Sequence, residues 1–126
     1  KSLFILGKYF ENAAFIEMSR NMLNNVLPEI VSYGPGYSNW ALLLLYFTQP
    51  FYEVAIVGKS VDEKRRSLQK HMLPNVIFAG SVAQSELPLL KNRFVENQTL
   101  IYVCENKTCM APVKTVEEAI KQYICP

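Results

Sequence analysis

The chain has 126 residues, half of them hydrophobic, and its formal net charge is +2. This length suits a single globular domain with a hydrophobic core, and the interspersed charges of both signs form no basic footprint for nucleic acid or for a membrane surface. The longest apolar run, residues 40–47, is far shorter than the roughly 20 residues that span a bilayer.

The first 49 residues have the apolar spacing of helices. Residues 1–6 predict the tail of a helix that ends at Gly7. Apolar residues at three- and four-residue steps predict an amphipathic helix over 11–27, with a kink or a new first turn at Pro28. A third helix, over about 39–47, is apolar on nearly every side and must be enclosed. We therefore expect a helical arm over residues 1–49.

From residue 50 the pattern changes to short β-branched runs that alternate with helical stretches. Strands are predicted over 53–57, 76–79 and 100–104, and helices over 60–72, from residue 85, and over 115–123. The first and last of these helices open on capping boxes, at Ser60 with Glu63 and at Thr115 with Glu118, and Met72 is placed on the inward side of the first. This alternation predicts an α/β unit over residues 50–126, with a small, mostly parallel sheet of three or four strands and flanking helices.

Gly58, Lys59 and Ser60 follow the first predicted strand and match the ending of a phosphate-binding loop. The position five before Gly58 is Glu53, where that loop requires a glycine, so the match does not support nucleotide binding. The three residues nevertheless form a candidate ligand rim, because open parallel sheets bind ligands beyond the carboxyl ends of their strands.

A basic cluster follows on the next predicted helix, at residues 64–66, Lys70 and His71. It suggests either an anion site or, more simply, a solvated helix face. His71 is the only histidine, and its sequence neighbourhood supplies neither a nucleophile elbow nor an orienting carboxylate. The sequence therefore contains no complete catalytic constellation.

Cys104 and Cys109 form a candidate thiol pair in a strand, polar loop, strand pattern. Three alternatives are open: packing thiols, a pair that can oxidise, or a metal site with Cys125, which would be incomplete unless His71 or a residue from outside the chain joined it. Lys107 would favour a thiolate and Glu105 would oppose it. With three cysteines and no signal peptide we expect a cytoplasmic protein with free thiols, no metal and no cofactor.

Four stretches resemble one family. They are Tyr-Ser-Asn-Trp-Ala at 37–41, Glu-Val-Ala-Ile-Val-Gly at 53–58, Leu-Pro-Asn at 73–75 and Tyr-Val-Cys-Glu-Asn-Lys-Thr-Cys-Met-Ala-Pro-Val at 102–113. Together they resemble the C-terminal end of thioredoxin-domain-containing proteins of the spermatogenesis-associated type. The resemblance implies a longer protein with an N-terminal thioredoxin-like domain, a helical toroid similar to six-hairpin glycosidases and sugar epimerases, and a C-terminal α/β segment. The helical arm would then be the end of the toroid.

The family's thioredoxin-type motif would lie outside these residues, so the resemblance assigns no redox role to Cys104 and Cys109. The function that it implies is a non-catalytic C-terminal segment with a structural or lid role on the toroid. The alternative is part of a sugar-modifying or thiol-handling enzyme, lining a site through Cys104 and Cys109 or through residues 58–60. The expected partners are the remaining domains of the parent protein and a second copy of this chain, joined as a dimer through the first 47 residues, with neither nucleic acid nor membrane.

Overall fold

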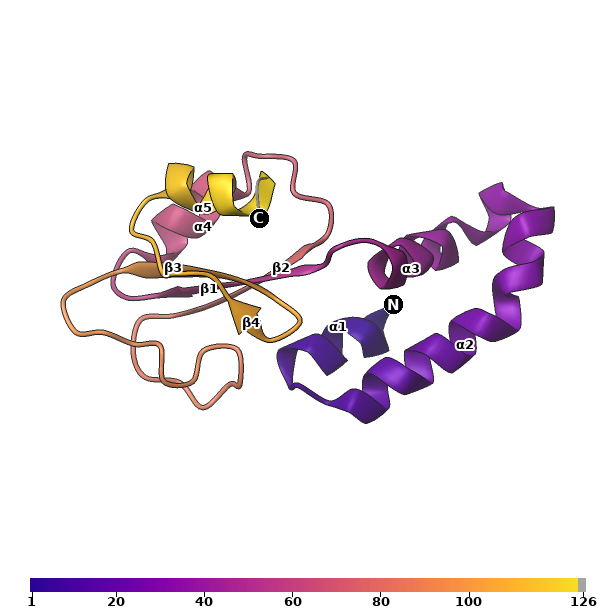
Figure 1. Ribbon diagram of the computed structural model, residues 1–126, viewed down its shortest axis with the longest axis horizontal. Helices are drawn as coiled ribbons and strands as arrows, with labels where there is room; N and C mark the ends of the chain where they lie inside the picture. Colours follow the sequence, from indigo (N-terminus) through magenta and orange to yellow (C-terminus); the bar gives the residue numbers. More distant parts are fainter. Residues whose placement is uncertain (125–126) are drawn as a thin grey trace. The chain divides into compact units, whose positions relative to one another are not determined.

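A computed structural model describes residues 1–124 of the chain. These residues form two compact units, Lys1–Pro50 and a second unit that begins at Phe51. The first unit is helical and the second combines helices with a sheet (Figure 1).

The helical unit consists of α1 (Ser2–Tyr9), α2 (Ala13–Ser32), the short 3-10 helix η1 (Gly34–Tyr37) and α3 (Ser38–Thr48). Asn12 caps α2, because its side-chain oxygen accepts a hydrogen bond of 3.2 Å from the Phe15 backbone N–H. Gly7 does not end α1 as expected. It is buried within the helix, where an added Cβ would lie 2.6 Å from Cδ1 of Ile16, so this glycine permits close packing of α1 on α2.

Two further expectations for the helical unit are corrected. At Pro28 we expected a kink or a new first turn, and the structure excludes the new first turn, because α2 continues through Pro28 to Ser32. The third helix is not enclosed within its own unit: only Leu43 is buried, while Leu45 keeps 48 % of its surface exposed. The apolar composition of this helix therefore exceeds what the neighbouring helices cover.

The second unit contains a four-stranded sheet in the order β2-β1-β3-β4. Its elements are β1 (Tyr52–Val57), α4 (Val61–Leu68), β2 (Val76–Ser81), β3 (Leu100–Glu105), β4 (Thr108–Cys109) and α5 (Val116–Ile124). The α/β class with flanking helices is confirmed. The sheet is mixed rather than mostly parallel, because β1 is parallel only to β2, while β1 with β3 and β3 with β4 are antiparallel.

The direction of β3 follows from the segment that precedes it. β2 ends at the same edge of the sheet as β1, and Leu100 at the start of β3 pairs with Val57 at the end of β1. A parallel strand would require a crossover back to the opposite edge. The described residues 82–99 form turns and irregular structure instead of the helix expected from residue 85. β3 therefore begins beside the C-terminal ends of β1 and β2 and runs antiparallel to β1.

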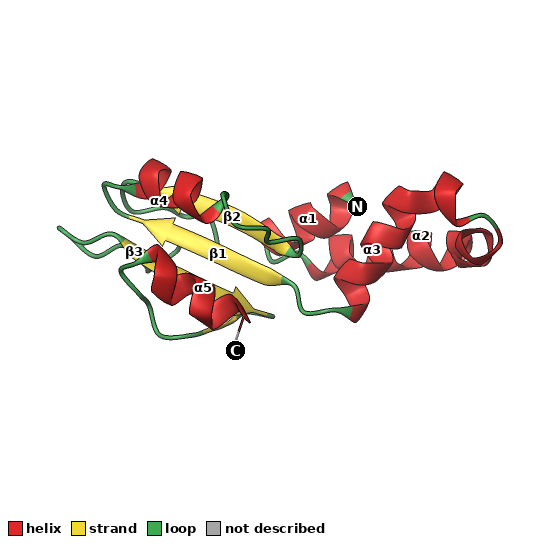
Figure 2. Ribbon diagram, turned by 90° about the horizontal axis from the view of Figure 1, so that it is seen from above, coloured by secondary structure: helices red, strands yellow, loops and turns green. Residues whose placement is uncertain are grey.

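One face of the sheet is covered by α4 and α5, as Figures 1 and 2 show. The buried side chains on this face come from both strands and helices: Tyr52, Val54, Ile56, Val61, Leu68, Ile101, Val103, Val116 and Ala119. α4 ends at Leu68, earlier than expected, and Met72 is 93 % exposed rather than inward. The helices thus cover the central strands with one continuous hydrophobic layer.

The opposite face of the sheet is covered by the irregular segment 82–99 (Figure 1). Leu89 and Leu90 in this segment are buried. Because side chains alternate along a strand, the residues of β1 that point to this face are Glu53, Ala55 and Val57. β1 is therefore buried on both faces along its whole length, which explains its continuous run of buried residues.

The two predicted capping boxes have different outcomes. Thr115 Oγ1 accepts a 3.2 Å hydrogen bond from the Glu118 backbone N–H, and Glu118 Oε2 accepts one of 3.1 Å from the Thr115 backbone N–H, so this box is confirmed. Ser60 precedes α4 but its side chain makes no capping hydrogen bond. Its backbone N–H instead donates to Thr99 Oγ1 at 3.2 Å, which ties the start of α4 to the residue before β3.

The capping box also predicts a pH dependence of stability. The hydrogen bonds from Thr115 lower the pKa of Glu118 below its ordinary value of 4.5. The stabilisation is therefore present above the pKa of the unfolded chain and is lost as the pH falls through the lowered pKa of the folded state.

We expect Glu118→Gln to be less stable than wild type at pH 7 and equal to it in acid below both pKa values. Urea unfolding at several pH values tests this, with the exposed neighbour substitution Glu117→Gln as the control. A stability difference that persists unchanged into acid would contradict it.

Candidate functional site

The two candidate cysteines lie on either side of a tight hairpin between β3 and β4. Glu105 pairs with Thr108, and the two loop residues, Asn106 and Lys107, have φ of 48° and 70°. Positive φ at both loop positions is the signature of a type I′ turn, which joins antiparallel strands with their natural twist. The predicted strand, thiol loop, strand pattern is confirmed, and the turn places Cys104 directly opposite Cys109.

Cys104 and Cys109 form a disulfide with an S–S distance of 2.15 Å, so the expectation of free thiols is wrong for this structure. Next to the cysteines, Val103 and Met110 form a hydrogen-bonded pair, in which the Met110 backbone N–H donates to the Val103 carbonyl at 3.0 Å. Hydrogen-bonded and non-hydrogen-bonded pairs alternate, so the cysteines occupy a non-hydrogen-bonded pair, where opposing side chains are closest. The turn therefore places the two sulfurs within bonding distance of each other.

Beyond the disulfide, the returning segment stays attached to β3 through a bulge. Ile101 and Val113 exchange two backbone hydrogen bonds of 2.8 Å and 2.9 Å. The next pair joins Val103 to Met110. From the first pair to the second, the chain advances two residues in β3 but spans three in the returning segment, which therefore contains one extra residue, a β-bulge. Pro112 lies in this bulge, a position where the missing N–H of proline is tolerated.

Arg93, which the sequence did not single out, contacts the disulfide from the irregular segment. Its Nη1 donates to Cys104 Sγ at 3.0 Å, and its guanidinium lies 5.2 Å from the centre of the Tyr102 ring. The Tyr102 hydroxyl in turn donates to the Arg93 carbonyl oxygen at 3.0 Å. The guanidinium is thus held against the sulfur by both side-chain stacking and a backbone anchor.

Glu53 is the second residue that the sequence did not assign to a site. It pairs directly with Cys104 in the antiparallel register, so both side chains lie on the face covered by segment 82–99. Glu53 is only 5 % exposed, and a buried carboxylate of this kind requires polar or charged partners. In the sequence, Glu53 stood out only as a charged residue at the start of an apolar strand. No local pattern marked Arg93, because its contact with Cys104 joins residues that are distant in the sequence.

The candidate rim lies at the other end of β1. Gly58 has φ of +129°, and its N–H donates to the Ser81 carbonyl at 2.9 Å, which joins the ends of β1 and β2. Lys59 is exposed and Ser60 is half-buried. The rim and the disulfide are about 17 Å apart along β1, at roughly 3.3 Å per residue, so they do not form one site.

A pocket of about 480 Å³ opens at this rim. Its lining combines two rim residues with side chains from the irregular segment: Gly58, Lys59, Val82, Phe94, Glu96, Asn97 and Gln98. The polar groups include one cation, one carboxylate and two amides, and an aromatic ring adds an apolar surface. This composition suits a neutral polar ligand better than a strongly charged one, because both charge signs are present.

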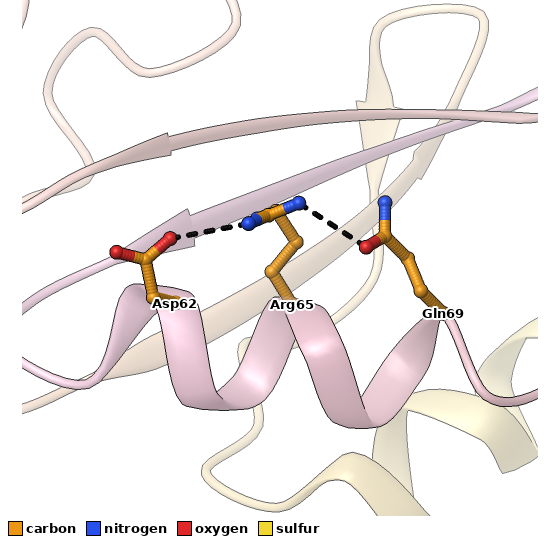
Figure 3. Close-up of polar contacts among 3 residues, drawn as sticks. All are labelled: Asp62, Arg65 and Gln69. Carbon is orange, nitrogen blue, oxygen red and sulfur yellow. Dashed lines mark hydrogen bonds and ion pairs between the residues drawn. The ribbon is translucent and has the colours of Figure 1, made fainter.

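Within the basic cluster, Arg65 makes polar contacts along the surface of α4. Arg65 Nη2 lies 3.4 Å from Asp62 Oδ1, and Arg65 Nη1 donates to Gln69 Oε1 at 3.1 Å (Figure 3). His71 is exposed beyond the end of the helix. These features agree with a solvated face, since pairs at three- and four-residue spacing are typical of exposed helices.

Within the described residues, no group of three His, Cys, Asp or Glu side chains could hold a metal ion. Cys125, the third cysteine considered as a ligand, lies outside the described residues. In the same part of the chain, no helix combines the length and the hydrophobicity needed to cross a membrane. Comparisons of the chain with protein-family models, with curated proteins and with solved structures find no match.

Proposed function

We propose that the chain is the non-catalytic C-terminal part of a larger cytoplasmic protein of the thioredoxin-domain-containing, spermatogenesis-associated type. Its α/β unit would have a structural or lid role on a helical toroid resembling that of the six-hairpin glycosidases. The proposed partners are the remaining domains of that protein. The observation that supports this role most strongly is that the residues of the motif at 102–113 join backbone segments of the α/β unit to one another.

Each part of this motif holds backbone segments together. The Tyr102 hydroxyl binds the Arg93 carbonyl and so fixes the irregular segment on the sheet. Cys104 and Cys109 join the two strands of the hairpin. Val113 returns to pair with Ile101 before α5 begins. Residues that share such backbone contacts support a structural role better than a catalytic one, because catalysis needs groups directed at a reacting atom.

Titration with saccharides separates the structural role from the alternative of a sugar site. We expect no change in the melting temperature of the chain with a panel of mono- and disaccharides. A ligand at ten times its Kd would stabilise the folded state by about 1.4 kcal/mol, which would raise the melting temperature of a domain of this size by several degrees. A reproducible, saturable shift with any sugar would contradict a purely structural role.

The second candidate function, a wall of a sugar-binding site, is favoured by the pocket at the rim. Amide and charged side chains beside the Phe94 ring are suited to hydrogen bonding and stacking with a polyhydroxylated ring. If a shift is observed, it should weaken in Lys59→Gln and persist in Lys70→Gln. The two substitutions remove the same charge from exposed lysines, but only Lys59 lines the pocket.

We also propose that the chain forms a dimer through its helical unit. Several large apolar side chains of this unit are exposed, namely Leu6, Phe10, Met18, Met22, Leu27, Val31, Tyr33 and Leu45. At about 25 cal/mol per Å², covering 400 Å² of apolar surface contributes roughly 10 kcal/mol, before the entropic cost of association. The predicted dimer would cover part of this surface.

Sedimentation over a range of concentrations tests the dimer. We expect reversible dimerisation at micromolar concentration, and we expect the double substitution Met18→Glu with Met22→Glu to shift the equilibrium to monomer. Met18 and Met22 are 52 % and 48 % exposed, so charged side chains at these positions need not disturb the fold. Val82→Glu, at an exposed position of the α/β unit, is the control and should leave the dimer intact. A strictly monomeric wild type would contradict the proposal.

A further inference from the structure

The two sulfurs of the disulfide differ in accessibility. Cys104 has no exposed surface, while Cys109 is partly exposed on β4, the outermost strand of the sheet. A thiolate that attacks a disulfide must approach one sulfur along the S–S axis, and access decides which sulfur is attacked. We therefore infer that an external thiolate attacks Cys109 Sγ, so that the sulfur that leaves is that of Cys104.

The leaving sulfur is the one that carries a cationic partner. Arg93 Nη1 already donates to Cys104 Sγ at 3.0 Å, and a guanidinium remains charged throughout the accessible pH range. Its positive charge favours the thiolate form of Cys104, and a leaving thiolate of lower pKa departs faster. Glu53 pairs with Cys104 on the same face of the sheet, and its negative charge would disfavour a thiolate at Cys104. The stabilisation of that thiolate is therefore assigned to the direct hydrogen bond from Arg93.

We propose that Cys104 and Cys109 form a thiol–disulfide exchange site that accepts thiol reductants at Cys109, with Arg93 as the positioning residue for the Cys104 thiolate. In the first step, the thiolate of a reductant forms a new S–S bond to Cys109 Sγ while the Cys104–Cys109 bond breaks. The electron pair of the broken bond remains on Cys104. This activity goes beyond the proposed structural role and does not depend on it.

A second thiol completes the exchange. With a dithiol reductant, its remaining thiolate attacks its own sulfur in the mixed disulfide, forms the reductant's internal disulfide and releases Cys109 as a thiolate. Two electrons have then passed from the reductant to the protein, and the two thiol protons of the reductant balance those taken up by Cys104 and Cys109. The reverse exchange would close the bridge again, with the disulfide form of the reductant as the acceptor of the two electrons.

The position of attack can be measured directly. The full chain carrying Cys125→Ser is treated with glutathione, quenched in acid, alkylated with N-ethylmaleimide and digested with trypsin. Lys107 lies between the cysteines, so cleavage after it places Cys104 and Cys109 on separate peptides. We expect glutathione on the Cys109 peptide and N-ethylmaleimide on the Cys104 peptide. Glutathione on Cys104, or equal labelling of both cysteines, would overturn the proposal.

The role of Arg93 is tested by the rate of reduction. An adjacent positive charge stabilises a leaving thiolate, and a thiolate that is less stabilised departs more slowly, so Arg93→Gln should slow reduction by dithiothreitol by roughly an order of magnitude. Arg93→Lys should recover part of the rate, because it keeps the charge. Arg66→Gln removes a similar charge from the exposed surface of α4 and should react at the wild-type rate.

A separate readout distinguishes this role from a general effect on the fold. In the reduced protein, the thiolate absorbance of Cys104 near 240 nm should appear at lower pH in wild type than in Arg93→Gln. Circular dichroism checks that the Arg93 variants are folded. The glutathione labelling experiment uses a protein that keeps Arg93, so its result does not depend on whether these variants fold. Equal reduction rates and equal thiolate titrations in Arg93→Gln and Arg66→Gln would overturn the assignment of Arg93.

Discussion

Gly58→Ala is expected to destabilise the α/β unit by about 3 kcal/mol or more. At φ of +129° only glycine is unstrained, and an added Cβ would lie 2.6 Å from Thr99 Cα and 2.7 Å from Thr99 Oγ1, besides clashing with the Gln98 carbonyl. Backbone strain of this kind costs of order 1–3 kcal/mol, and the contacts with backbone atoms add to it because those atoms cannot move aside. The same substitution would displace residues 97 and 98 from the pocket.

Urea unfolding followed by circular dichroism measures this effect, with Gly34→Ala as the matched control. No atom lies within 4 Å of the Cβ that would be added at Gly34. Its substitution should therefore change the free energy of unfolding by less than about 1 kcal/mol. Equal unfolding midpoints for the two alanine variants would show that the backbone at Gly58 is not constrained in this way.

Ile101→Ala is expected to cost about 3 kcal/mol of folding free energy. Ile101 has no exposed surface, and it belongs to the core between the sheet and the helices α4 and α5. Removing a fully buried isoleucine side chain to alanine loses its transfer free energy and leaves a cavity, with a combined cost of about 2–5 kcal/mol. The strands are fixed by backbone pairing on both sides of this position, which limits their collapse into the cavity.

The matched control for this core substitution is Val82→Ala in the same unit. Val82 is 65 % exposed, so its truncation should change the stability by no more than about 0.5 kcal/mol. Chemical denaturation of both variants gives the comparison. If Ile101→Ala unfolded at the same denaturant concentration as Val82→Ala, the assigned core between the sheet and its helices would be wrong.

The parts of the fold that were predictable from sequence are those fixed by local interactions. The capping box at Thr115 and Glu118 joins residues three apart, and β1 is recognisable because it is apolar and buried on both faces. The direction of β3 was not predictable in this way. It depends on the irregular segment 82–99, where a short helix was expected from residue 85 but the described residues form turns and irregular structure, with Leu89 and Leu90 buried.

The candidate site shows the same division between local and long-range information. The hairpin around Cys104 and Cys109 was visible as a strand, loop, strand pattern, but disulfide formation depended on the register set by positive φ at Asn106 and Lys107. The contact of Arg93 with Cys104 joins residues eleven apart through a fold that no local pattern specifies. The hairpin that carries the thiol pair was therefore recognisable from the sequence, but the charged groups around the thiols were not.

We have proposed that this chain is part of a larger protein of the thioredoxin-domain-containing, spermatogenesis-associated type. Peptide sequencing of the native protein by mass spectrometry, after enrichment with an antibody against the α/β unit, tests this proposal. We expect one polypeptide in which a helical domain and, before it, a domain with a thioredoxin-type motif precede Lys1. A native polypeptide that contains this chain but has no thioredoxin-type motif would contradict the claim.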